Sequence, residues 1–195
     1  MRGRVRIWDL PMRIFHWVLV VSFFVAYWTE EEFLAIHTLA GYLVIALLVF
    51  RLLWGFTGGT YARFSSFICY PSESFAYLTA LIQRKAPRYL GHNPAGSAMI
   101  VLMLSSIFLT VMTGLAVYGA DQHAGPLAGL IRGNDDFWEE SHEFFANLCL
   151  LLIFAHVCGV LYESWYHKEN LIRSMFNGYK DPITADSRKA GHQDE

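Results

Sequence analysis

Four long apolar segments constrain the fold of this sequence more than any other feature. Crossing the hydrocarbon core of a bilayer as a helix takes roughly 20 mainly apolar residues, and each segment reaches that length. Only 16% of the chain is charged, against about 25% in soluble domains. The sequence therefore predicts an all-α integral membrane protein, built as a bundle of four transmembrane helices. The predicted spans cover about residues 10–29, 34–54, 95–119 and 140–163.

The first span is expected to stay in the mature protein. Asp9 can cap its start, and Pro11 suits a first helical turn. A basic start and an apolar middle are also typical of a signal peptide, but the stretch "VAYWTEEE" at its end offers no small-residue cleavage site.

Lys and Arg gather on one side of the predicted membrane. Fourteen of the fifteen lie before the first span, at or after the end of the second, or after the fourth. Because cytoplasmic loops carry an excess of basic residues, both termini and the long loop over residues 57–92 are predicted to face the cytoplasm. We expect one membrane domain over residues 1–180, with residues 70–85 lying along the membrane surface, and a polar, flexible tail over residues 181–195.

Four of the eight histidines lie within spans or at their starts, whereas the others fall in loops, at span ends or in the tail. Ionisable groups inside a membrane are costly and usually functional. For any single histidine, the alternative is a neutral imidazole that hydrogen-bonds a neighbouring helix. The four are His16, His37, His142 and His156.

The spacing of these histidines predicts two pairs. His142 and His156 are 14 residues apart, close to four helical turns, so they share a face about 21 Å apart along the axis. Judged by depth, His37 pairs with His142 near the outer surface, and His16 pairs with His156 near the cytoplasm. Two ligands per level are too few for a closed zinc or copper site. Paired neutral imidazoles in an apolar bundle instead indicate two six-coordinate haems b.

Three further residues are candidates for haem contacts. Gly41 lies one turn from His37 and would let a flat macrocycle approach the backbone, although small residues also serve ordinary helix packing. Arg51 lies 14 residues beyond His37 and can pair with a haem propionate, or act as a positive-inside anchor. Arg13 precedes His16 by three residues. No CxxCH motif is present, so covalent haem attachment is not expected.

The histidine-bearing segments resemble the prokaryotic cytochrome b561 family and the related b-type cytochrome subunit of nickel–iron hydrogenases. The resemblance covers roughly residues 5–180 and is carried by "RIFHW", "HTLAGYLVIALLVFRLLW", "YLGHNPAG" and "HEFFANLCLLLIFAHVCGVLYESWYHKENLIRSM". It implies a protein of the bacterial inner membrane with two haems b, ligated by His16, His37, His142 and His156. It also implies electron transfer between the quinone pool and a second partner.

Three functions are compatible with this resemblance. The first is electron transfer between quinone, bound near Tyr89 and His92, and a periplasmic redox protein such as a c-type cytochrome. The second is a superoxide:quinone oxidoreductase, and the third is the membrane anchor of a hydrogenase-like complex. No catalytic side chain and no nucleic-acid partner are expected.

Acidic residues dominate the two predicted outer loops. Such a surface would repel superoxide and steer a cationic protein toward the outer haem, although acidic residues are also simply tolerated outside the membrane. Against the single Arg132, these loops carry Glu30, Glu31, Glu32, Asp121, Asp135, Asp136, Glu139 and Glu140.

Overall fold

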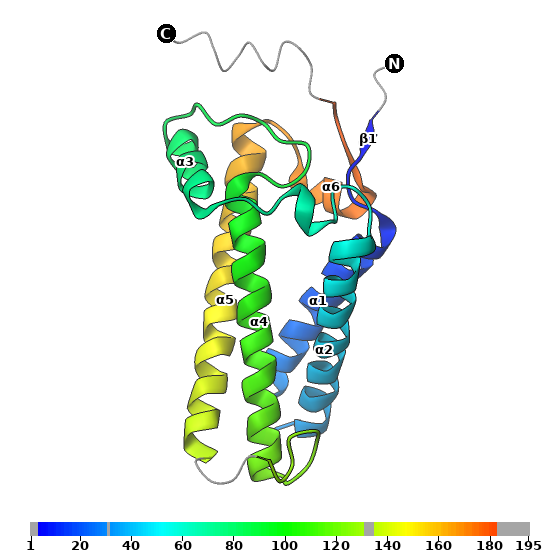
Figure 1. The fold of residues 1–195 in the computed structure, drawn as a ribbon, viewed down its shortest axis with the longest axis vertical. Helices are drawn as coiled ribbons and strands as arrows, with labels where there is room; N and C mark the ends of the chain where they lie inside the picture. Colours follow the sequence, from blue (N-terminus) through cyan, green and yellow to red (C-terminus); the bar gives the residue numbers. More distant parts are fainter. Residues whose placement is uncertain (1–3, 31, 131–134, 183–195) are drawn as a thin grey trace. The chain divides into compact units, whose positions relative to one another are not determined.

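Four long helices form most of the protein in the computed structural model (Figure 1). All four are long and apolar enough to cross a membrane, which confirms the predicted class of an all-α, four-helix membrane protein. They cover the four predicted spans, and α5 begins earlier than predicted. The helices are α1 (Leu10–Thr29), α2 (Leu34–Thr57), α4 (Pro94–Asp121) and α5 (Asp135–Tyr166). The structure describes residues 4–30, 32–130 and 135–182, so the predicted tail beyond residue 182 lies outside it.

Short elements connect and flank the long helices. The helix α3 (Pro71–Ile82) lies in the stretch predicted to follow the membrane surface, and proline occupies its first turn. The other short elements are the 3-10 helix η1 (Phe64–Ser66), α6 (Leu171–Asn177), β1 (Val5–Arg6) and β2 (Tyr179–Lys180). The two strands pair antiparallel, with Val5 opposite Lys180.

The chain divides into two compact units, each assembled from stretches far apart in sequence. Unit 1 comprises Met1–Phe15, Arg51–Val101 and Ala155–Glu195, and unit 2 comprises His16–Phe50 and Leu102–Phe154. Each long helix contributes residues to both units. The fourteen basic residues that predict the orientation all belong to the stretches of unit 1.

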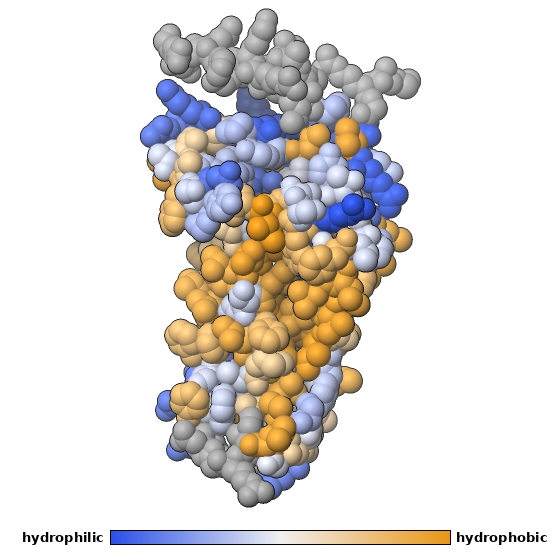
Figure 2. Space-filling view, in the orientation of Figure 1, coloured by the Kyte–Doolittle hydropathy of each residue, from blue (hydrophilic) through white to orange (hydrophobic). Residues whose placement is uncertain are grey.

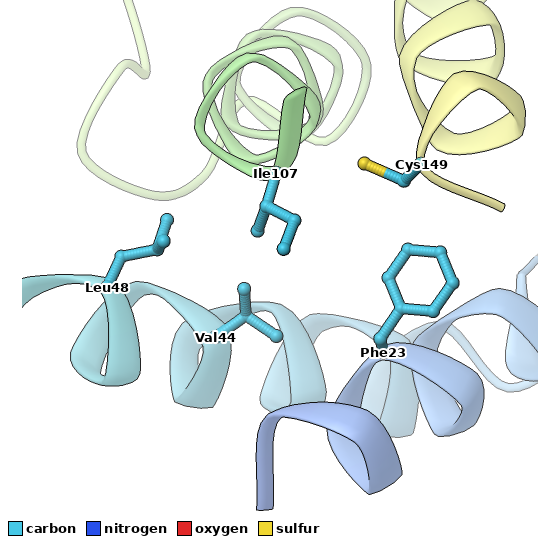
Figure 3. Close-up of a cluster of buried hydrophobic side chains, with 5 residues drawn as sticks. All are labelled: Phe23, Val44, Leu48, Ile107 and Cys149. Atoms are coloured by element: carbon cyan, nitrogen blue, oxygen red, sulfur yellow. The ribbon is translucent and has the colours of Figure 1, made fainter. Parts of the chain in front are cut away.

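The core of unit 2 receives side chains from all four long helices (Figure 3). The sulfur of Cys149 lies 3.1 Å from the Ser106 hydroxyl and 3.4 Å from that of Thr110, so the polar groups in this apolar core satisfy one another. The buried apolar cluster consists of Phe23, Val44, Leu48, Ile107 and Cys149.

In unit 1, Asp9 joins the start of α1 to the end of α2. One carboxylate oxygen accepts a 2.9 Å hydrogen bond from the Met12 amide, which is the helix cap that the sequence predicts. The other accepts a 3.1 Å bond from the Trp54 indole.

The outer faces of the long helices are apolar. Large hydrophobic side chains such as Leu39, Phe108 and Phe154 are exposed on them, and Figure 2 shows hydrophobic residues over these helices and hydrophilic residues toward their ends. Lipid is the solvent that suits such surfaces.

Candidate haem site and a polar pocket

Of the two predicted histidine pairs, the structure brings His37 and His142 together within unit 2. Their ring centroids, on α2 and α5, are 5.9 Å apart with the planes at 80°. Metal–imidazole bonds of about 2 Å place two opposed nitrogens about 4 Å apart and the ring centres about 6 Å apart. The separation of the rings therefore suits two imidazoles that share one metal ion.

Both rings are held in the tautomer that a metal ligand requires. Nδ1 of His37 lies 2.9 Å from the Ala26 carbonyl oxygen, and Nδ1 of His142 lies 2.9 Å from that of Thr110. A carbonyl can only accept, so Nδ1 carries the hydrogen in each neutral ring and donates it. The lone pair is then on Nε2, and the backbone bond fixes the orientation of the ring.

Glycine at position 114 makes room for one of these rings. A Cβ atom there would lie 2.8 Å from Cε1 and 3.1 Å from Nδ1 of His142, so any side chain would require the imidazole to move. The sequence analysis missed Gly114, because a helix pattern does not reveal which neighbour a glycine faces.

The space beside Gly41 is open. A Cβ atom at this position would meet no atom of the described residues within 4 Å. An apolar site with two imidazoles and free space at a glycine fits the flat macrocycle of a haem. Within residues 4–30, 32–130 and 135–182, no cluster of three or more His, Cys, Asp or Glu residues could hold another metal ion.

The second predicted pair is divided between the units. His16 belongs to unit 2 and His156 to unit 1, so their pairing stays a prediction. Both side chains are half-buried, and the His16 ring packs edge-on against Trp17 with centroids 5.0 Å apart.

Arg51 is deeply buried at the end of α2. The residue is 3% exposed, and its guanidinium carbon lies 4.6 Å from the centroid of the Phe64 ring and 5.8 Å from that of Phe67. Its buried Nη1 has no hydrogen-bond partner in the described part of the chain. Burying a cation with an unsatisfied donor is costly, so the position fits an anionic group such as a carboxylate of a cofactor. If Arg51 only anchored the helix end at the membrane surface, its guanidinium would be expected to reach water.

Arg13 has a structural role in unit 1. Its Nη1 donates a hydrogen bond to the carbonyl of Phe176 and so ties α1 to α6. The contact between Arg13 and a haem therefore stays a prediction.

His92 and Tyr89 line one pocket of unit 1, with a volume of about 540 Å³. The His92 ring lies between Trp8 and Phe67, with centroid distances of 4.6 and 4.8 Å, and its buried Nδ1 has no partner among the described residues. Burial lowers the pKa of His92 most, and together with the nearby positive charges of Arg51 and Lys180 and the effect of His156 it brings the pKa to about 3. The imidazole is therefore neutral near pH 7.

A buried carboxylate lies next to this pocket. Glu163 accepts hydrogen bonds at Oε1 from the Tyr77 hydroxyl at 2.7 Å and from the Asn93 amide at 2.9 Å. Its Oε2 lies 3.4 Å from Nε2 of His167. The sequence analysis missed this network, although an acidic residue in the last turns of an otherwise apolar span was a signal.

A second buried ion-pair group adjoins His167. Arg88 Nη2 and Glu169 Oε1 are 2.7 Å apart, and Lys180 Nζ lies 3.6 Å from Glu169 Oε2. Burial lowers the pKa of His167, and the positive charge of Arg88 lowers it further.

The described acidic residues of the predicted outer loops are exposed. They belong to unit 2, whereas Glu31, Arg132 and the side chain of Asp135 lie outside the part that the structure describes. The exposed residues are Glu30, Glu32, Asp121, Asp136, Glu139 and Glu140.

Comparisons with known proteins identify the family of the chain. The family model described as "Prokaryotic cytochrome b561" matches residues 7–178. A probable Ni/Fe-hydrogenase B-type cytochrome subunit of Rhizobium leguminosarum is 24% identical over 91% of this chain and 89% of the relative. The probable Ni/Fe-hydrogenase 1 B-type cytochrome subunit of Escherichia coli K12 is 26% identical over 89% of each chain. No solved structure gives a significant match. The chain is therefore a membrane b-type cytochrome that belongs to the prokaryotic cytochrome b561 family.

Proposed function

We propose that this cytochrome holds two haems b and conducts electrons between the quinone pool of a bacterial inner membrane and a redox protein on the outer side. His37 and His142 would hold one haem, and His16 and His156 the other. The observation that carries the proposal is the matched geometry of His37 and His142, whose Nδ1 atoms both bond backbone carbonyls.

The protein residues determine what such a site can do. Haem b supplies a one-electron iron couple when bound. Two imidazoles fill both axial positions, which favours electron transfer over binding of oxygen. The apolar cluster around Phe23 and Val44 would help to exclude water from the site of His37 and His142. Arg51, 14 residues beyond His37, would offer its buried positive charge to a propionate of the other haem.

The pocket that contains His92 and Tyr89 is proposed as the quinone site. Its volume of about 540 Å³ is within the usual range for small-molecule sites. The neutral His92 ring has a buried Nδ1 without a partner among the described residues, so it can hydrogen-bond an oxygen of the quinone ring. His92 also lies close enough to His156 for that imidazole to affect its pKa. Replacing His92 by Ala should slow haem reduction by quinol with both haems retained, and an unchanged rate would contradict this assignment.

Two kinds of partner are supported by different observations. The exposed acidic residues of unit 2 would steer a cationic protein such as a c-type cytochrome, and they weigh against superoxide as the substrate. The curated relatives are named as subunits of Ni/Fe hydrogenases, which supports a hydrogenase-like partner as the second candidate. Purification in mild detergent distinguishes them, because a stable large iron–sulfur partner would remain bound.

The haem assignment is tested by the haem-to-protein ratio and the visible spectrum of the purified chain. We expect two haems in the wild type and one after His37→Ala or His142→Ala, with the same haem lost in both variants. His16→Ala and His156→Ala should remove the other haem. His123→Ala, in a loop where its Nδ1 bonds the Asp121 carbonyl, is the matched control. A colourless protein, or a haem content that survives loss of His37, would overturn the proposal.

A further inference from the structure

Quinone chemistry at the proposed site needs protons as well as electrons. Reducing a quinone to a quinol takes two electrons and two protons, and the reverse reaction releases the same number of each. His92 is neutral near pH 7, because its pKa lies at about 3, so its one N–H can bond a quinone oxygen but the ring holds no extra proton to supply. Another group must exchange protons between the pocket and water.

Tyr77 starts a route out of this pocket. The residue is one of the lining residues and is buried, and its hydroxyl lies 2.7 Å from Oε1 of Glu163. Burial raises the pKa of Tyr77, and the hydrogen bond to Glu163 raises it further. The phenol therefore stays protonated and can pass a proton only by accepting one and releasing another.

Glu163 continues the route toward a second cavity. Its other oxygen lies 3.4 Å from Nε2 of His167, and a turn of the ring would complete a hydrogen bond that this nitrogen does not make among the described residues. The side chains of both residues are 12% exposed. The Asn93 amide donates a 2.9 Å bond to Oε1 and holds the carboxylate between its two partners. Glu163 lines neither cavity, which leaves it as the link between them.

His167 lines a polar cavity of about 300 Å³ in unit 1. Exposed residues, among them Lys168, Asn170 and Arg173, complete its wall, so water reaches the imidazole. The low pKa of His167, caused first by burial and then by Arg88, keeps the ring neutral, with one nitrogen free to accept a proton.

We propose that Tyr77, Glu163 and His167 form a proton relay between the proposed quinone pocket and the polar cavity that His167 lines. In the direction of quinone reduction, His167 takes a proton from water and passes one to Oε2 of Glu163. The carboxyl group reorients and gives a proton to the Tyr77 oxygen, while the original hydroxyl proton of Tyr77 moves to the quinone oxygen. Each side chain returns to its starting state, and two such transfers balance the two electrons that bound haem would supply. The inference rests on the proposed quinone site.

The variant Glu163→Gln tests the relay, because its amide oxygen still accepts the bonds of Tyr77 and Asn93 but carries no exchangeable acid. We expect the haem content, the thermal stability and the rate of reduction by dithionite to match the wild type. Haem reduction by quinol should slow at least tenfold and show a larger solvent deuterium isotope effect. The carboxyl band in the redox-difference infrared spectrum should disappear. Asp181→Asn makes the same chemical change at an exposed residue beside the same cavity and should leave all these values unchanged.

A second pair of variants keeps the proposal testable if Glu163→Gln folds poorly. Tyr77→Phe should slow the reaction with quinol by a similar factor, and His167→Ala should do so until imidazole is added to the buffer. Wild-type rates in Glu163→Gln and Tyr77→Phe would refute the relay while leaving the quinone reaction intact. A wild-type protein that quinol fails to reduce would instead refute the proposed function, and the relay with it.

Discussion

Gly114 and His142 are in such close contact that any side chain at position 114 would displace the imidazole. The missing Cβ would lie 2.8 Å from the imidazole carbon Cε1, and this ring also bonds the Thr110 carbonyl. The position of a proposed haem ligand on α5 thus depends on one glycine of α4.

Substitution of that glycine should therefore disturb a haem without removing a ligand. In Gly114→Ala, the methyl group pushes the His142 ring away from its bond with Thr110, so we expect the haem-to-protein ratio to fall toward half. Gly159→Ala is the control, because a Cβ there meets nothing within 4 Å in the described protein. Equal haem content in both variants would show that the ring tolerates displacement.

The open space at Gly41 predicts that a substitution there has opposite effects on the haem-free and the haem-loaded protein. A methyl group at this position contacts no described residue, so Gly41→Ala should stabilise the haem-free helix slightly, by up to about 1 kcal/mol. If the macrocycle lies there, the same change should weaken haem retention. Thermal unfolding of the haem-free and haem-loaded protein measures both effects, and a gain in both forms would argue for ordinary helix packing.

Removal of the Arg51 charge should change a reduction potential. Arg51→Met keeps most of the buried volume but deletes the positive charge, which stabilises reduced iron relative to oxidised iron when it lies near a propionate. We expect the potential of one haem to fall in Arg51→Met and to recover largely in Arg51→Lys. Redox titration followed at the haem absorption bands measures this, and two unchanged potentials would assign Arg51 to anchoring alone.

The protonation of His92 should make stability depend on pH. The imidazole titrates near 6.5 when unfolded but at about 3 in the structure, because burial disfavours its charged form. The unfolded state binds more protons between these values, so the free energy of unfolding falls as the pH drops from about 6.5 to about 3. His92→Gln should flatten this slope, whereas His123→Gln should not. Thermal unfolding in detergent between pH 4 and 7 gives the comparison.

Two ion pairs in unit 1 should differ strongly in their contribution to stability. Arg88 and Glu169 have side chains 15% and 13% exposed, whereas Arg4 and Asp181 are 55% and 81% exposed. Glu169→Gln leaves Arg88 and Lys180 buried without their counter-charge, at a cost of about 3 kcal/mol. Asp181→Asn should cost less than about 1 kcal/mol. Similar losses in chemical unfolding would mean that water reaches the Glu169 pair.

Much of the architecture could be predicted because membrane insertion depends on length and hydropathy, which are properties of the sequence itself. Asp9 as a helix cap and the helix after Tyr70 followed from equally local rules. The juxtaposition of His37 and His142 needed only helical periodicity and depth, since the distribution of Lys and Arg fixes which end of each span faces the cytoplasm.

The parts of the site that the sequence did not predict depend on how each helix is rotated about its own axis. Nothing in the sequence says that Gly114 faces His142, or that Ala26 and Thr110 direct their carbonyls at imidazoles. Glu163 was overlooked because its partners come from other segments, Tyr77 from α3 and Asn93 from the loop before α4. Such contacts are set by side-chain packing, which the hydropathy pattern does not encode.

The pairing of β1 with β2 has a consequence for biosynthesis. Val5 is translated before the four long helices, but Lys180, its neighbour across the strand pair, is translated only after all four of them. The strand β1 therefore has no β2 to pair with until the four long helices have been made. Pairing of the two strands can thus follow only the synthesis of all four long helices, and it joins segments that are made before and after them.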